Sequence, residues 1–155
     1  MEGSRFIFNR ASEFIRRADH MFYMTYPLVR DNKLIITMAE NICNGMNYAI
    51  DALLMHEREY KRISPYPDEF GIKLDIFRKI AARYDINKES VNMIIDLKMF
   101  LEERKNSKME FIKNDKYMLF NQKQELKSLG IDKLKQNLNI SKEFIKRIGD
   151  IIANA

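Results

Sequence analysis

The segment from Lys33 to Ile63 carries apolar residues on two faces of a helix, and this pattern constrains the fold more than any other in the chain. A helix with two apolar faces needs neighbours on both sides, so it belongs at the centre of a helical bundle. Gly45 and Ala49 would let one neighbour approach closely. One stripe consists of Leu34, Met38, Ile42, Gly45, Ala49, Ala52 and His56, and the second of Ile36, Cys43, Ile50 and Leu54.

Turn-forming residues are scarce, with 5 Gly and 3 Pro among 155 residues. A β-sandwich or barrel needs a turn about every 8 to 12 residues, and these turns draw on Gly and Pro. Apolar residues make up 46% of the chain, enough for a packed core in a domain of this length. We therefore expect a single all-α domain over residues 1–155, an up-and-down bundle of about five to six helices.

Prolines and capping residues predict the helix boundaries. The first helix should end before Pro27, because a proline pushes the preceding residue out of helical dihedrals. The sequence at 64–68 contains two prolines and ends in Asp68, which is placed to cap the next helix. The turn at 85–87 likewise ends in a capping residue, Asn87. The first four helices are thus expected over about residues 5–26, 33–63, 69–84 and 88–105.

The C-terminal third is less regular. We expect a long ordered loop over residues 106–122, and ordered loops of this length tend to be functional. Within it, residues 117–120 are apolar and fit either an extended stretch or a helical turn. A short helix over residues 122–129 should end at Gly130. Apolar residues then keep helical phase from Ile131 to Ile152, which predicts one long helix; the alternative is a helix-turn-helix that breaks at Asn139 and restarts at Ser141.

Chemistry-bearing motifs are few. One Cys and two His supply neither a zinc cluster nor a histidine pair, and no glycine-rich phosphate loop is present, so we expect no metal, no cofactor and no catalytic residue. Cys43 fits a small buried hydrophobe. The helix over 33–63 has a polar strip, which is either a candidate interface or a solvated edge. This strip consists of Glu40, Asn44, Asn47 and Asp51.

Positive charge is concentrated in the C-terminal third. Residues 1–97 hold 14 basic and 14 acidic side chains, whereas residues 98–147 hold 13 basic and 7 acidic. Cations interleaved with aromatic residues suit phosphate attraction and base stacking, although a solvated loop anchored by aromatics would have the same composition. The candidate nucleic-acid-binding residues are Arg104, Lys105, Lys108, Phe111, Lys113, Lys116 and Tyr117.

The order of these parts resembles the HEPN superfamily, the higher-eukaryote and prokaryote nucleotide-binding domains. The resemblance covers roughly residues 5–152 and rests on the long first helix pair, on the sequence Ala49-Ile50-Asp51-Ala52-Leu53-Leu54, and on Arg104 and Asn106 at the end of the fourth helix. Ribonuclease members of the family pair such an arginine with a histidine that follows after four to six intervening residues. Those positions here hold Met109, Glu110 and Phe111.

The missing histidine implies a non-catalytic member of that superfamily. Such relatives associate with RNA or with protein partners, nucleotidyltransferases among them, and commonly form homodimers. Two alternatives are a metal-independent ribonuclease that uses Arg104 and a purely structural oligomerisation protein. Because the chain has no run of about 20 apolar residues and no signal-peptide pattern at its beginning, we expect a cytoplasmic protein without a membrane span.

Overall fold

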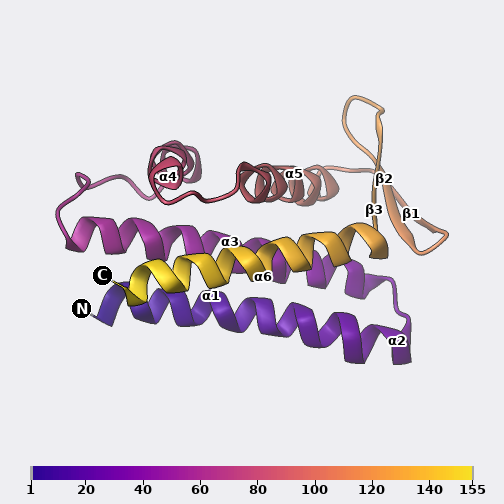
Figure 1. Cartoon of the computed structure of the whole chain (residues 1–155). Coiled ribbons are helices and arrows are strands. Elements are labelled where there is room, and N and C mark those ends of the chain that lie inside the picture. Colours follow the sequence, from indigo (N-terminus) through magenta and orange to yellow (C-terminus); the bar gives the residue numbers. More distant parts are fainter. Residues whose placement is uncertain (1, 155) are drawn as a thin grey trace.

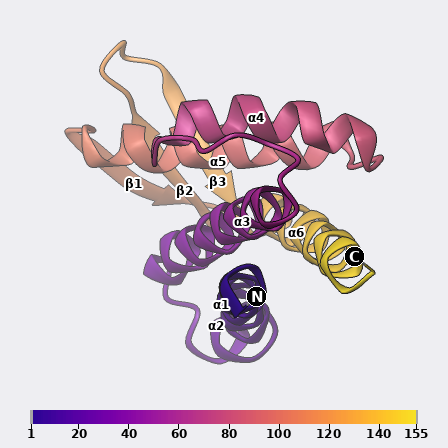
Figure 2. The same ribbon diagram turned by 90° about the vertical axis from the view of Figure 1, so that its left-hand side faces the viewer.

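The computed structural model describes residues 2–154 and is mostly helical. Helices α1 (Glu2–His20), α3 (Lys33–Glu59) and α6 (Ile131–Ala153) run side by side along the molecule (Figure 1). Helices α4 (Phe70–Arg83) and α5 (Lys88–Lys105) lie across α3, on the side away from α1 (Figure 2). A small antiparallel sheet stands at one end of the bundle. The expected bundle is therefore present, but the chain is not all-α.

Helix α3 is the centre of the bundle, as predicted. It contacts α1 and α6 on one side and α4 and α5 on the other. A Cβ atom at Gly45 would lie 2.5 Å from Cδ1 of Ile15 and 3.2 Å from the carbonyl oxygen of Ala11, so α1 approaches α3 closely at this residue. The two apolar faces of α3 are thus covered by helices of the same chain. Ile15 is buried in this contact.

The first helical run does not end at Pro27. A π-helical turn, η1 (Met21–Thr25), follows α1, and the backbone N–H of Tyr26 donates to the carbonyl of Met21. Helix α2 (Tyr26–Val29) then holds Pro27 in its first turn and ends at Arg30, whose φ is 50°. A proline lacks the N–H that a regular helix would use and clashes with the preceding turn. The wider π turn accommodates the ring, so the helix continues past the predicted boundary.

The caps of the next helices follow the sequence in part. Asn87 caps α5 as expected, since its Oδ1 accepts from the N–H of Glu89 at 2.9 Å. Asp68 does not cap α4; instead Glu69 accepts from the N–H groups of residues 71 and 72, each at 2.9 Å. The carboxylate of Asp68 pairs with Lys73, which explains why the neighbouring residue takes the capping role. Helix α3 ends at Glu59, before the predicted Ile63.

Residues 109–130 form three antiparallel strands in the order β1 (Met109–Lys113), β2 (Lys116–Phe120) and β3 (Leu126–Gly130). The long loop and the short helix expected there were therefore wrong. The β1–β2 turn has φ of 52° at Asn114 and 60° at Asp115, which is typical of a two-residue hairpin turn.

The β2–β3 connection is organised by Asn121. Its Oδ1 accepts from the N–H groups of Lys123 and Glu125, at 3.0 and 2.8 Å. Such a side chain to backbone turn competes with helix formation, so residues 122–129 turn back into a strand.

Helix α6 is continuous, so the helix-turn-helix alternative was wrong. Ser141 does not cap a new helix; its hydroxyl donates to the carbonyl of Leu138 at 2.7 Å, within the same helix. Buried Leu134, Leu138 and Ile148 lie in the core together with residues of α3. Among residues 2–154, no helix is both long enough and apolar enough to cross a membrane.

Candidate functional site

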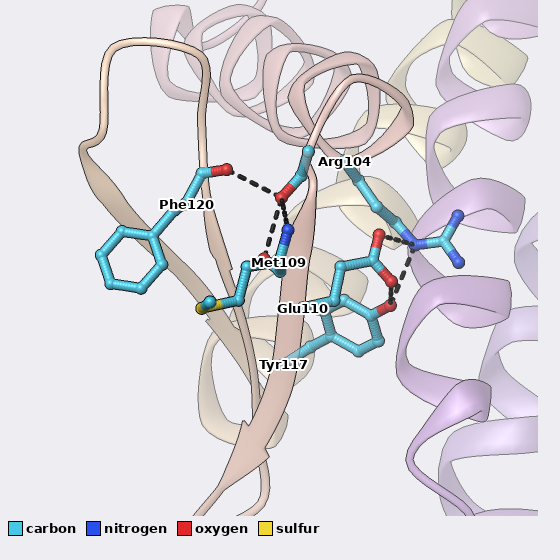
Figure 3. A network of polar contacts seen from close by, with 6 residues as sticks. Arg104, Met109, Glu110, Tyr117 and Phe120 are labelled. Carbon is cyan, nitrogen blue, oxygen red and sulfur yellow. Dashed lines mark hydrogen bonds and ion pairs between the residues drawn. The ribbon is translucent and has the colours of Figure 1, made fainter.

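Arg104, Tyr117 and Glu110 form a polar network where α5 meets the sheet (Figure 3). Nε of Arg104 lies 3.3 Å from the hydroxyl of Tyr117 and 3.7 Å from Oε1 of Glu110. The Tyr117 hydroxyl donates a short hydrogen bond to the other carboxylate oxygen of Glu110. The guanidinium also lies over the Tyr117 ring, 5.6 Å from its centroid. These contacts fix the Nε side of the arginine, and Figure 3 shows its two terminal nitrogens pointing away from the sheet.

The network keeps Arg104 charged and Tyr117 protonated. Its hydrogen bond with Tyr117 raises the pKa of Arg104 above its usual value, against the opposing effect of burial. Burial raises the pKa of Tyr117, and the hydrogen bond to Glu110 adds to this, while Arg104 acts in the opposite direction. Tyr117 therefore serves here as a neutral hydrogen-bond donor and not as a base.

The hydroxyl of Ser107 joins the start of β1 to the end of β2 beside this network. It donates to the carbonyl of Phe120 at 2.7 Å and accepts from the N–H of Met109 at 3.3 Å (Figure 3). Because α5 ends at Lys105, this serine fixes the position of the sheet relative to the end of the helix. Glu110 consequently lies next to Arg104.

A surface cleft of about 230 Å³ between α3 and α5 joins two groups of residues that the sequence had left separate. Glu40, Asn44 and Asn47 of the polar strip line it from α3, while Arg104 and Lys105 line it from α5. The side-chain oxygen of Asn47 is buried without a hydrogen-bond partner among residues 2–154. The cleft therefore combines amide, carboxylate and cationic groups.

Asp51, the last residue of the predicted strip, lies elsewhere. Its carboxylate pairs with Nζ of Lys73 at 2.9 Å, and the same lysine pairs with Asp68. Asp51 thus ties α3 to α4 and to the segment before it, which is a structural role.

The outward face of the sheet carries three of the predicted nucleic-acid residues, Phe111, Lys113 and Lys116, together with five that the sequence did not indicate. Directly paired residues share a face of a sheet. Lys113 pairs with Lys116 next to the β1–β2 turn, and Phe111 pairs with Met118 in the next row. We call this surface the outward sheet face; it consists of Met109, Phe111, Lys113, Lys116, Met118, Phe120, Leu126 and Ser128.

The outward sheet face is open and partly apolar. All of β1 is exposed, including Met109 at 58% and Phe111 at 37%. The rings of Phe111 and Phe120 lie 6.2 Å apart between centroids. At one end of this face, Lys108, Met109 and Phe120 help to line a pocket of about 510 Å³ together with the side-chain amides of Asn121, Gln122 and Gln124.

Tyr117 is not on this surface. It lies on the inward face with Leu119 and Leu129 and is buried, so its ring is not free to stack on a base. The predicted basic cluster therefore divides into two parts: Arg104 and Lys105 line the α3–α5 cleft, and Phe111, Lys113 and Lys116 lie on the outward sheet face. The signal in the sequence that indicates this hairpin was Asn114-Asp115, a pair of turn-forming residues that stands before the apolar run at 117–120.

Comparisons with protein-family models, with curated proteins and with solved structures found no match. Among residues 2–154, no three His, Cys, Asp or Glu side chains gather where they could hold a metal ion.

Proposed function

We propose that this chain is a non-catalytic RNA-binding module that contacts single-stranded RNA through the outward sheet face. The observation that supports this most is the register that puts Phe111 beside Met118 and Lys113 beside Lys116 on one exposed surface. Bases stack on exposed aromatic side chains, and lysines next to them attract the phosphate backbone. A side chain such as Phe111, exposed on an edge strand, is well suited to this contact because it does not have to leave a core.

The fold class and the oligomeric state belong to the same proposal. We regard the chain as a degenerate HEPN-type domain, supported by the long α1–α3 pair and by Arg104 at the end of α5. We propose that homodimerisation uses a surface other than α3, because helices of the same chain cover α3 on both sides. Met24, Leu28 and Val29 are exposed apolar residues around Pro27 and would lie in such an interface.

The proposal is tested by fluorescence anisotropy with a labelled single-stranded oligoribonucleotide at several salt concentrations. Binding should weaken as salt rises, because phosphate contacts release counterions. Phe111→Ala should raise the Kd about tenfold, in line with the loss of one base stack. Lys113→Gln should raise the Kd and reduce the salt dependence by about one phosphate contact.

Two matched variants control for general effects. Phe6→Ala removes another exposed phenylalanine, 62% accessible on α1, and Lys105→Gln removes the same charge from the α3–α5 cleft. The Kd of each control variant for RNA should be closer to that of the wild type than the Kd of Phe111→Ala or Lys113→Gln. Equal losses in Lys105→Gln and Lys113→Gln, or no RNA retention at low salt, would refute binding by the outward sheet face and favour a protein partner or a purely structural role.

A metal-independent ribonuclease is the second candidate, because Glu110 lies beside Arg104. The carboxylate of Glu110 would repel phosphate, and the motif histidine is absent, which is why the non-catalytic proposal ranks first. RNA cleavage by purified protein in the presence of chelator, abolished in Arg104→Ala, would establish this candidate. Retention of all cleavage in that variant would assign it to a contaminant.

A further inference from the structure

A cleft of about 670 Å³ lies away from the network of Figure 3. It is bounded by α2, by the β1–β2 turn and by the first turn of α6. Three cations and two carboxylates line it, so the charge balance is positive. The charged residues are Arg30, Lys116, Lys133, Asp115 and Asp132.

The N-terminus of α6 faces this cleft without a side-chain cap. Its N-cap residue is Gly130, and no side chain bonds to the free N–H groups of the first turn. The aligned peptide dipoles of a helix this long attract an anion to that end. The side chain of Lys116 passes over the same point, since a Cβ atom at Gly130 would lie 2.9 Å from Cγ of Lys116.

Tyr26 supplies an independent indication of a ligand. Its side chain lines the cleft and is only 8% exposed, yet its hydroxyl has no hydrogen-bond partner among residues 2–154. Burial raises the pKa of this phenol, the charge of Asp115 adds to the effect and Arg30 opposes it. A buried hydroxyl without a partner costs free energy, and a ligand oxygen would remove that cost.

We propose that this cleft binds a phosphate monoester, with its phosphate oxygens at the N-terminus of α6. Free N–H groups of the first turn and the Tyr26 hydroxyl donate hydrogen bonds to the phosphate, and Arg30 and Lys116 balance its charge. Asp115 and Asp132 leave an excess of one positive charge and therefore limit the affinity. This site goes beyond the proposed RNA contact, since Tyr26 and Arg30 lie outside the outward sheet face.

The test is isothermal titration of the whole chain with inorganic phosphate at low ionic strength, with chloride at equal ionic strength as the reference. Phosphate should bind and chloride should not. Tyr26→Phe should raise the Kd for phosphate about tenfold, as expected for the loss of a hydrogen bond to a charged group. Its Tm without ligand should not fall, because the hydroxyl has no partner to lose.

Substitutions of charged residues at the cleft and away from it test the phosphate site further. Lys116→Met retains the stem that lies over Gly130 but removes the charge, and should weaken phosphate binding, whereas Lys146→Met, an exposed residue elsewhere on α6, should not. Asp132→Asn should lower the Kd, because it removes a repelling carboxylate. No binding of phosphate, or equal losses in Lys116→Met and Lys146→Met, would overturn the proposal.

Competition with two oligoribonucleotides shows whether the phosphate belongs to an RNA end or to a small molecule. An oligoribonucleotide with a 5′-phosphate should compete with inorganic phosphate more strongly than the same oligonucleotide with a 5′-hydroxyl if the natural ligand is an RNA end. Equal competition by the two, combined with tighter binding of a phosphorylated mononucleotide, would assign the site to a small phosphate monoester. Failure of Phe111→Ala to affect RNA binding would refute the sheet contact and leave this site intact.

Discussion

The bundle formed by α1, α3 and α6 and the sheet formed by β1, β2 and β3 use their side chains in opposite ways. Helix α3 buries residues on two sides, and at Gly45 not even a methyl group fits without displacing a neighbour. The sheet buries only one face, with Tyr117, Leu119 and Leu129, and leaves the other open. The bundle therefore supplies most of the stability, and the sheet supplies a surface that can change without unfolding the domain.

This division also separates the two candidate binding surfaces from the core. The outward sheet face lies on five-residue strands, and the phosphate cleft lies where the β1–β2 turn meets the ends of two helical runs. Neither surface needs a residue from the middle of the bundle. Variants in the two regions should therefore affect different quantities: the free energy of unfolding in the bundle and binding at the sheet.

The largest expected effect is on the free energy of unfolding, and it comes from making the same Leu→Ala substitution in the bundle and in the sheet. Leu53→Ala, at a fully buried position of α3, should lower the free energy of unfolding by about 3 kcal/mol through lost burial and a cavity. Leu126→Ala, at a residue that is 52% exposed on the outward sheet face, should change it by less than about 0.5 kcal/mol. Urea denaturation monitored by circular dichroism measures both. Similar losses in the two variants would contradict the division.

Thiol reactivity gives a second contrast. Burial raises the pKa of Cys43 to about 11, and only 6% of the residue is exposed. Since the thiolate is the reactive form, alkylation by iodoacetamide at pH 8 should be at least about 100-fold slower than for an ordinary cysteine.

The matched variant places a cysteine on the outward sheet face. In Cys43→Ser with Ser128→Cys, the new thiol should react at the rate of a free cysteine, because Ser128 is exposed. Native Cys43 should reach that rate only in denaturant. Fast alkylation of native Cys43 would instead mean that the α3–α5 cleft opens readily.

A smaller effect tests the close approach of α1 and α3. Gly45→Ala should lower the free energy of unfolding by about 1 to 3 kcal/mol, because the new methyl group meets Ile15 and the Ala11 carbonyl oxygen. Ile15→Val removes Cδ1, the nearest of these atoms, and the double variant should recover part of the loss. Asn44→Ala, at the exposed neighbouring position, serves as the control in the same denaturation experiment.

The bundle was predictable from the sequence for a physical reason. Its helices repeat the same apolar spacing over many residues, so a single residue that departs from the pattern does not change the prediction. The two apolar stripes of α3 predict its central place. Asn87 was predictable as a cap because capping depends on neighbours in sequence. The predicted end of the first helix before Pro27 was wrong. A proline usually ends a helix, but here the π turn before Pro27 allows the helical run to continue.

The sheet and the sites were harder to predict. Strands of five residues give too few repeats of a two-residue period, and Lys116 and Lys127 dilute the apolar pattern. Arg104 and Glu110 are near each other in the sequence, but their contact depends on how β1 returns past the end of α5. The phosphate cleft depends on Tyr26, Lys116 and Asp132, which are far apart in the sequence and meet only in the fold.

The smallest expected effect concerns pH and lies wholly within the bundle. His56 is 3% exposed, and its Nε2 has no partner among residues 2–154. Burial lowers its pKa below the usual 6.5, with Glu57 and Glu59 opposing and Arg62 reinforcing the shift. As pH falls through 6.5, the unfolded chain binds a proton before the folded chain does, so the free energy of unfolding should decrease from there down to the folded pKa and stay flat above 6.5.

Denaturation between about pH 5.5 and 8, a range around the ordinary histidine pKa, measures this slope. His56→Phe keeps a ring against Tyr60 and removes the proton site, so its stability should be flatter with pH. His20→Phe removes the other histidine, which is exposed, and should retain the wild-type slope. If the slope vanished in His20→Phe instead, the pH response would come from the surface of α1, and the core around His56 would tolerate a charged imidazole.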